Sequence, residues 1–394
     1  MVGMLRPRYL ARAIAEDALP AGKMAFVSGP RQVGKTTLGK RLLADPERNY
    51  FSWDETDFRR AWATSPTRAV MERGEGPVLL DEIHKDRRWK SRLKGLYDTR
   101  GDELRIIVTG SARLDLYRRG GESLLGRYFP YRLHPFSVGE SEKPPAPEEI
   151  LATTDARYPW ADLLKLGGFP EPLFGGSERR ARRWSRLRLE RLIAEDLRDL
   201  RAIADLQAVR VLADLLPGRV GSLLSMNALR EHLGVAYGTV RAWLGVFEAL
   251  YLCFLVRPYA ARLARALRAE PKLYLYDVLS LPSAAARQEN LVALHLLKAC
   301  HYWTDTAQGE FDLRFVRDKE KREIDFLVLR DHRPWLAVEC KSNQRVPSGN
   351  LVHFSDRLEV PLRFQLVNGV RFDRAYPETK VRVLDYERFL AGLP

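Results

Sequence analysis

One stretch of eight residues, Gly29 to Thr36, restricts the fold of this chain more than any other feature. It reads GPRQVGKT and fits the spacing G-x-x-x-x-G-K-[ST] without a gap. A short apolar run, KMAFVS at 23–28, precedes it, and residues 37–43 show helical spacing. Two glycines permit a tight loop whose backbone N–H groups face phosphate oxygens. The pattern predicts strand, phosphate-binding loop and helix in that order, and therefore an α/β domain.

The residue types in this loop suit a nucleotide triphosphate. Lys35 can supply a point charge to the β- and γ-phosphates, and the Thr36 hydroxyl is a hard oxygen ligand of the kind that Mg²⁺ requires. We expect ATP and Mg²⁺ as cofactors. The residues expected to contact the nucleotide are Gly29, Pro30, Arg31, Gln32, Val33, Gly34, Lys35, Thr36 and Thr37.

Two further apolar runs end in polar residues. The run 78–80 is followed by Asp81 and Glu82, and the run 104–108 is followed by Thr109, Gly110 and Ser111. Strands that alternate with helical segments indicate a parallel sheet. Asp81 is then placed to hold magnesium through its water shell, and Glu82 to orient or deprotonate the attacking water. A purely structural role is the alternative for Glu82.

With this acidic pair downstream of the loop, the chain resembles the AAA-type (AAA+) ATPases. In them the Walker B strand ends in an Asp-Glu pair and the next strand ends in a polar sensor residue, a position matched by Thr109 or Ser111. The strings TGSARLDL (109–116), LLGRYFPYRLHPFS (124–137) and GGFPEPL (167–173) occur together in one prokaryotic group of these ATPases, which carries a C-terminal nuclease-like domain. The resemblance implies sites between subunits of a homo-oligomer, most simply a hexameric ring. Arg127 is the candidate for the arginine supplied to the neighbour, and a surface ion pair is its alternative.

Length and charge indicate several domains and an anionic partner. The chain has 394 residues, too many for one core of ordinary size, and its Lys and Arg outnumber Asp and Glu by 65 to 51, which gives a net charge of +14. Nucleic acid, and DNA in particular, leads the partners expected from this charge, with acidic proteins and membrane surfaces behind it. The three cysteines lie singly in apolar or strand-like runs, which predicts buried reduced thiols. The N-terminal residues have no apolar signal segment, and the most apolar stretch, 249–256, is too short to span a bilayer, so we expect a cytoplasmic protein with no membrane partner.

The middle of the chain contains two candidate DNA-binding segments. The helical stretch 179–191 is dense in arginine, which is typical either of a solvated face or of a face that contacts nucleic acid or a neighbouring subunit. Residues 226–233, 234–236 and 237–250 read as helix, turn and helix, with a shared core from Leu229, Leu233, Val240, Leu244 and Phe247. Tyr237, Thr239 and Arg241 should then be exposed where base edges are usually read. The basic segment 257–272 reads as a wing whose phosphate contacts would come from Arg262, Arg265, Arg268 and Lys272. A spacer or protein-contact role is the alternative.

The last part of the chain carries acidic residues at sheet positions. The string 322–343 predicts two strands that place Asp325 beside Glu339 and Lys341, the last two on one face. This pattern resembles the PD-(D/E)XK nuclease signature, and Glu289, in the helical segment 287–297, matches a further acidic ligand. The resemblance implies a Mg²⁺ site made by Glu289, Asp325 and Glu339 with Lys341 as a catalytic residue. Retention of the fold without cleavage is the alternative. The histidines at 84, 295, 301 and 353 are scattered, which indicates ordinary surface or core residues.

Together these features predict a multidomain α/β protein. The expected parts are a P-loop AAA-type ATPase domain (1–145), an arginine-rich helical lid (146–205), a winged helix-turn-helix (206–280) and a restriction-endonuclease-like α/β domain (281–394). The preferred function is ATP hydrolysis by an oligomeric motor acting on DNA. Two alternatives are an ATP-dependent switch or scaffold for protein partners, and a metal-dependent endonuclease with a regulatory ATPase.

Overall fold

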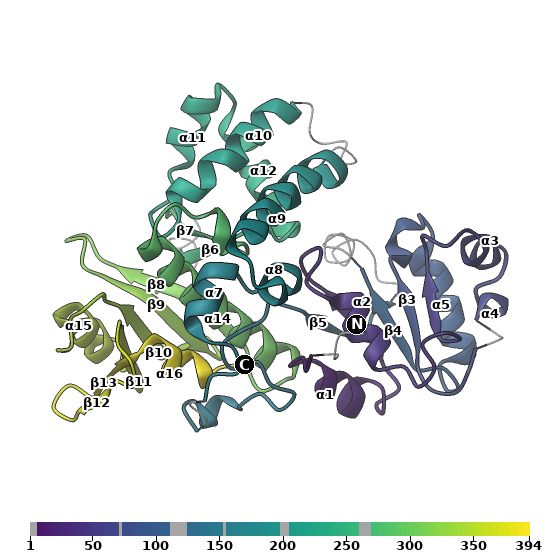
Figure 1. The fold of residues 1–394 in the computed structure, drawn as a ribbon, viewed down its shortest axis with the longest axis horizontal. Helices are drawn as coiled ribbons and strands as arrows, with labels where there is room; N and C mark the ends of the chain where they lie inside the picture. The colour runs from purple at the N-terminus through teal and green to yellow at the C-terminus, as the bar shows by residue number, and fades with distance from the viewer. Residues whose placement is uncertain (1–5, 71–72, 111–123, 153–154, 198–204, 260–268) are drawn as a thin grey trace. The chain divides into compact units, whose positions relative to one another are not determined.

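The computed structural model describes residues 6–70, 73–110, 124–152, 155–197, 205–259 and 269–394. Contacts within the chain divide it into two compact units. One comprises Met1–Pro135, Ser141–Lys143 and Ala249–Tyr251, and the other comprises Phe136–Glu140, Pro144–Glu248 and Leu252–Pro394. Each unit is built around its own β-sheet (Figure 1).

The described part of the first unit contains a five-stranded parallel sheet in the order β2-β3-β4-β1-β5. Its central strands are short runs of Val, Leu, Ile and Phe that are buried along their whole length, as expected of a parallel sheet covered on both faces. The sequence predicts one strand before the loop 29–36, one leading to the acidic pair and one leading to Thr109. All three strands are present. The strands are β1 (Met24–Ser28), β2 (Tyr50–Ser52), β3 (Val78–Asp81), β4 (Ile106–Thr109) and β5 (Tyr128–Arg132).

Helices cover both faces of this sheet because successive strand residues point to opposite sides. Val78 and Leu80 belong to a core that includes Trp62 and Leu93, whereas Leu79 between them lies against Gly39 on the other face. A Cβ at Gly39 would lie 2.7 Å from the Leu79 side chain, so the helix there approaches the sheet closely. The helices are α1 (Ala11–Ala13), α2 (Lys35–Arg41), α3 (Thr56–Thr64), α4 (Pro66–Ala69) and α5 (Trp89–Arg100).

The described part of the second unit contains an eight-stranded mixed sheet in the order β12-β13-β11-β10-β9-β8-β6-β7. Strands β6 and β7 form an antiparallel pair, and β6 also runs parallel to β8. The sheet therefore crosses the boundary expected at residue 280. The strands are β6 (Cys253–Pro258), β7 (Lys272–Leu275), β8 (Phe311–Arg317), β9 (Glu323–Arg330), β10 (Arg333–Cys340), β11 (Leu362–Val367), β12 (Asp373–Tyr376) and β13 (Val381–Asp385).

Helices lie where the sequence predicts them at 226–233 and 237–250. Ser225 caps α11 by accepting a hydrogen bond from the Ala228 N–H, and Gly234 ends the helix with a φ of 66°. The helices of this unit are α7 (Trp160–Leu166), α8 (Pro170–Gly175), α9 (Glu178–Arg191), α10 (Leu206–Leu215), α11 (Met226–Leu233), α12 (Tyr237–Ala249), α14 (Ala284–Asp305), α15 (Gly349–Arg357) and α16 (Tyr386–Ala391).

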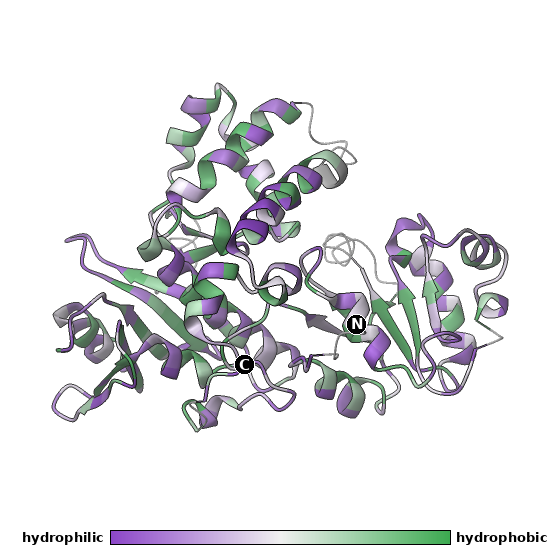
Figure 2. Cartoon of the chain, viewed as in Figure 1, coloured by the Kyte–Doolittle hydropathy of each residue, from purple (hydrophilic) through white to green (hydrophobic). Residues whose placement is uncertain are grey.

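The distribution of hydrophobic residues agrees with this layout. Figure 2 shows hydrophobic colour along the central strands of both sheets and a mixture of hydrophilic and hydrophobic residues on α9. Cys253 and Cys300 are buried and Cys340 is half-buried, and all three are free thiols. Among the helices of the described ranges, none combines the length and the apolar composition that crossing a bilayer demands.

Candidate nucleotide site and acidic cluster

The loop between β1 and α2 depends on its two glycines. Gly29 has a φ of 150°, and a Cβ there would lie 2.3 Å from the carbonyl oxygen of Leu133, just after β5. Gly34, at the N-terminus of α2, has a φ of 98°, a conformation that side-chain-bearing residues rarely adopt. The backbone conformation at both positions therefore requires glycine.

The Lys35 side chain lies inside this loop. It is 8% exposed, and its ammonium donates hydrogen bonds to the carbonyl oxygens of Gly29 at 3.0 Å and of Pro30 at 2.8 Å. These contacts hold the charge within the loop, where the G-x-x-x-x-G-K-[ST] pattern places the β- and γ-phosphates. Thr37 follows on α2, whereas Arg31, Gln32 and Val33 lie in the loop between the two glycines.

Asp81, at the end of β3, is the centre of the polar residues at this edge of the sheet. One carboxylate oxygen accepts hydrogen bonds from the Thr36 hydroxyl at 2.9 Å and from the Tyr50 hydroxyl at 3.1 Å. The other oxygen accepts one from the Thr109 hydroxyl at 2.5 Å. The hydroxyl of Thr36 and the carboxylate of Asp81 are hard oxygen donors in direct contact, so these residues fit a magnesium ion that also binds phosphate. Tyr50 has no motif around it, and no pattern in the sequence indicates its role.

Glu82 follows directly, and its backbone N–H donates to the carbonyl oxygen of Thr109 at 2.9 Å. Its carboxylate lies 3.5 Å from Nε2 of His84 and 3.8 Å from Nζ of Lys85. Burial raises the pKa of Glu82, while the charges of Lys35 and Lys85 act in the opposite direction. A carboxylate with a raised pKa is a better proton acceptor than an exposed one. His84, which the sequence indicates to be an ordinary surface or core residue, is buried and lies against this carboxylate.

Arg127 and Ser111 are the remaining candidate residues of this domain, and the structure describes only the first of them. Arg127 makes a paired contact with Asp98 in the same chain, Nε to Oδ1 at 2.7 Å and Nη2 to Oδ2 at 3.1 Å. This is the surface ion pair that was the alternative to a transition-state arginine. Ser111 lies outside the described residues, so of the two sensor candidates only Thr109 can be placed.

The acidic residues expected in the C-terminal part come together between β7, β9, β10 and α14. Glu339 lies 2.7 Å from Nζ of Lys341, and its other oxygen accepts a 3.4 Å hydrogen bond from the Asp325 N–H. Asp325 in turn accepts a 2.8 Å hydrogen bond from the Cys340 N–H. Glu289 accepts one of 2.8 Å from the Tyr274 hydroxyl. The pKa values of Glu289 and Glu339 are both raised to about 7, mainly because the two carboxylates are buried.

Lys272 was expected on an exposed wing, and that expectation was wrong. The residue begins β7, is 3% exposed, and points into the acidic cluster. Pairing of β7 with β6 inserts it into the sheet, so a residue that reads as basic and exposed in sequence is enclosed by carboxylates. No sequence pattern singled out Glu323, whose carboxylate lies 2.5 Å from the Lys272 ammonium.

The DNA-contact candidates are only partly covered by the described residues. Tyr237 at the start of α12 is 49% exposed, Arg241 is exposed and Thr239 is half-buried, while Arg262 and Arg265 lie outside the described residues. Of the expected core, Leu229, Val240, Leu244 and Phe247 are buried and Leu233 is half-buried. Helix α9 exposes Arg179, Arg180, Arg182, Arg183 and Arg186.

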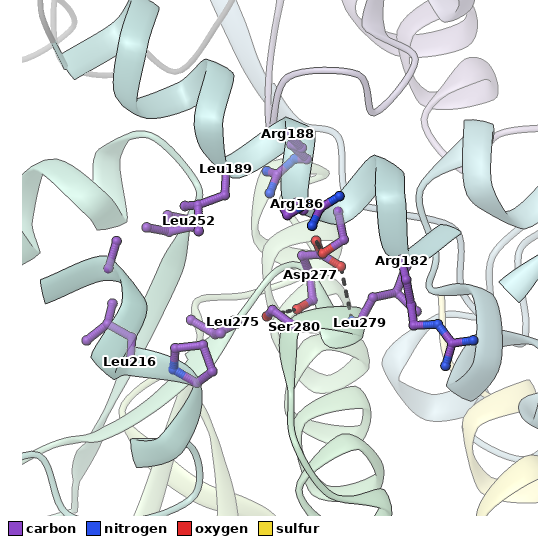
Figure 3. A pocket seen from close by; sticks show the side chains of 13 residues that line it. Arg182, Arg186, Arg188, Leu189, Leu216, Leu252, Leu275, Asp277, Leu279 and Ser280 are labelled. Carbon is purple, nitrogen blue, oxygen red and sulfur yellow. Dashed lines mark hydrogen bonds between the residues drawn. The ribbon is translucent and has the colours of Figure 1, made fainter. Parts of the chain in front are cut away.

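A cavity of about 340 Å³ lies beside α9 in the second unit (Figure 3). Its lining is mainly apolar, with Leu216 and Leu275 on one side and Arg182 and Arg186 of α9 on the other. Asp277 is anchored at its wall by the Ser185 hydroxyl at 2.5 Å and the Leu279 N–H at 3.1 Å. The lining residues come from four separate stretches of chain, so no local pattern could have predicted it.

Comparison with known protein families covers most of the chain in three parts. A family model described as "AAA domain" matches residues 21–142. This match and the loop 29–36 support an AAA-type P-loop ATPase core in this part of the chain. Residues 158–290 match a domain of unknown function, DUF8612, and residues 286–381 match another, DUF4143. The acidic cluster takes residues from both of these segments.

Individual relatives are distant. The uncharacterized protein Rv2008c of Mycobacterium tuberculosis is 25% identical over 361 residues, which cover 86% of this chain and 77% of that protein. The uncharacterized protein MJ1637 of Methanocaldococcus jannaschii is 26% identical over 61% of this chain and 58% of its own length. Among solved structures, Aeropyrum pernix Orc1 in complex with DNA has a TM-score of 0.33 at 16% identity, covering 72% of this chain and 91% of that chain. The Thermotoga maritima RuvB Holliday junction branch migration motor has a TM-score of 0.30 at 16% identity, covering 68% and 99%.

Proposed function

We propose that this protein binds ATP with Mg²⁺ at the loop 29–36 and hydrolyses it. The observation that carries the proposal is the contact of Asp81 with both Thr36 and Thr109, because it joins the loop, the Walker B strand and the sensor strand at one point of an AAA domain. Thr36 and Asp81 would hold the magnesium ion, which supplies charge neutralisation of the phosphates. Lys35 binds the β- and γ-phosphates, and Glu82 accepts a proton from the attacking water.

DNA is the polymer on which we propose that this ATPase acts. The support is the net charge of +14, together with the exposed arginines of α9 and the exposed Arg241 at the start of the second helix of a helix-turn-helix. Such contacts would be made mainly to phosphates, so sequence preference should be weak. We also propose an oligomeric assembly, most simply a hexameric ring, in which an arginine of one subunit completes the site of the next. Arg127 would have to release Asp98 to serve in this way.

The ATPase rate, measured with and without single-stranded, duplex and branched DNA, tests the proposed ATP hydrolysis and the proposed action on DNA. The mass of the ATP-bound particle tests assembly. We expect DNA to raise the rate several-fold, and added salt to reverse the effect. A Lys35→Ala chain serves as the control for contaminating ATPases. A rate that no DNA changes, together with no salt-sensitive DNA binding, would refute the DNA proposal and leave the ATPase intact, and would favour the switch for protein partners. A monomer with full activity would refute the ring.

A further inference from the structure

The acidic cluster of the second unit contains a cation of its own. Nζ of Lys272 lies 2.5 Å from Oε1 of Glu323, 3.7 Å from Oδ1 of Asp325 and 3.8 Å from Oε1 of Glu289. These are three carboxylates from β9 and α14, and two of them are residues that the PD-(D/E)XK resemblance assigns to a metal ion.

The position of this ammonium is fixed by its surroundings. The backbone of Lys272 is paired with Val256 of β6 on one side and bridged to Leu223 on the other. The ammonium also lies 5.5 Å from the centre of the Phe315 ring, within the range of a cation–π contact. Burial acts to lower the pKa of Lys272, but the attraction of Asp325, Glu289 and Glu323 outweighs it and the pKa lies above its ordinary value. The carboxylates of β9 and α14 therefore stabilise the ammonium form of this side chain.

The carboxylates around it already have protein donors. The second oxygen of Glu323 contacts Arg317 at 2.8 Å, and the second oxygen of Asp325 accepts from the Cys340 N–H. Glu289 is bound by Tyr274, and Glu339 by Lys341. A divalent cation needs several carboxylate or carbonyl oxygens directed at one point, and it is repelled by an ammonium at that point. Within the described residues, no three His, Cys, Asp or Glu side chains converge closely enough to hold a metal ion. The residues therefore do not fit the metal that the resemblance implies.

We propose that the Lys272 ammonium is the permanent counter-ion of this cluster in place of a divalent cation, and that the C-terminal domain keeps the nuclease-like fold without metal-dependent cleavage. This inference is independent of the ATPase proposal, because none of the residues involved belongs to the AAA domain.

Mn²⁺ binding to the full nucleotide-free chain, measured by calorimetry or electron paramagnetic resonance, tests the proposal. We compare the unaltered protein with Glu339→Gln, Lys272→Met, the Lys272→Met/Glu339→Gln double variant and Lys341→Met. Any ion held by Thr36 and Asp81 is common to all these chains and cancels in the differences. We expect the unaltered protein and Glu339→Gln to bind the same amount of Mn²⁺. Lys272→Met should gain one site per chain, at least tenfold tighter than any residual binding there, and the double variant should lose it. Lys341→Met, the matched control, should gain none because Lys272 remains.

Two results would overturn the proposal. One is a Mn²⁺ site in the unaltered protein that Glu339→Gln removes, a comparison that stays valid even if Lys272→Met fails to fold. The other is an equal gain in Lys272→Met and Lys341→Met, which would show that Lys272 has no special position. Incubation of circular and branched DNA with Mg²⁺ or Mn²⁺, beside a Glu339→Ala chain, adds a chemical readout. We expect no products, and products absent from the Glu339→Ala chain would refute the proposal.

Discussion

The hydroxyl of Thr36 and the carboxylate of Asp81 are joined by a 2.9 Å hydrogen bond, although 45 residues separate them in the chain. Thr109 donates to the second oxygen of the same carboxylate. Because β3 and β4 are parallel neighbours, their carboxyl ends meet at the edge where the loop after β1 also emerges. The arrangement couples the phosphate-binding loop to the strand that Glu82 directly follows.

Replacing Lys35 and replacing Glu82 should have different effects on the ATPase. Lys35→Ala removes a charge that contacts phosphate, and loss of a charged hydrogen bond of about 1.5–3 kcal/mol weakens nucleotide binding by roughly 10- to 100-fold. Glu82→Gln keeps the shape of the site but removes the proton acceptor, so binding should be unchanged while turnover falls by about 100-fold or more. Fluorescent-nucleotide titration and phosphate release measure the two quantities, with Lys23→Ala as a surface control. Normal turnover in Glu82→Gln would refute its assignment.

Tyr50→Phe tests the residue that sequence reasoning missed. The variant loses only the hydroxyl that donates to Asp81, so we expect about 1 kcal/mol less stability. It should also need several-fold more Mg²⁺ for half-maximal ATPase, because Asp81 is less firmly oriented. Magnesium titrations of the rate at saturating ATP measure this effect. An unchanged magnesium requirement in a protein that is less stable would show that Tyr50 only supports the fold.

The stability of the second unit should depend on pH through Glu339. Its pKa is about 7 in the folded chain, raised from 4.5. Between these values the folded state holds a proton that the unfolded state has lost, so stability falls as pH rises through this window and is constant above it. Glu339→Gln should remove this contribution, making the loss of stability between pH 5 and pH 8 smaller by roughly 1–3 kcal/mol.

Thermal or urea unfolding at several pH values makes that comparison, with the exposed Glu378→Gln as a matched control. His295 contributes in the opposite direction, since burial lowers its pKa to about 3 and stability is lost as pH falls below 6.5. This contribution is common to all three chains and cancels between them. Parallel pH profiles for Glu339→Gln and the unaltered chain would contradict the assignment.

Removing basic residues should locate the DNA surface. Replacing Arg241, Arg262 and Arg265 by Ala should weaken DNA binding about equally for all sequences and lower the slope of log affinity against log salt by up to about 3. ATP binding without DNA should stay unchanged. The companion variant replaces Arg182, Arg183 and Arg186 on α9. If only this second set weakens binding, the helix-turn-helix is not the contact surface.

Local patterns predicted much of this protein because the residues involved are close in sequence. Helix α11 was predicted at 226–233, where it occurs, since its cap, periodicity and terminal glycine all lie within ten residues. The loop 29–36 is a motif of the same kind. Lys272, Tyr50 and the cavity beside α9 could not be predicted in this way. Each depends on which distant strand or helix lies beside it, and hydrophobic periodicity carries no information about that neighbour.

The pairing of β6 with β8 bears on how this protein can be cut into pieces for study. A fragment that starts at residue 281 follows the apparent boundary in the sequence, but it would lack β6 and β7 and leave Arg314 and Phe315 on the edge of β8 without their partners in β6. Unpaired edges of this kind attract other chains and promote aggregation. Such a fragment would also separate Lys272 from the carboxylates that surround it. A soluble C-terminal fragment should therefore begin upstream of Cys253.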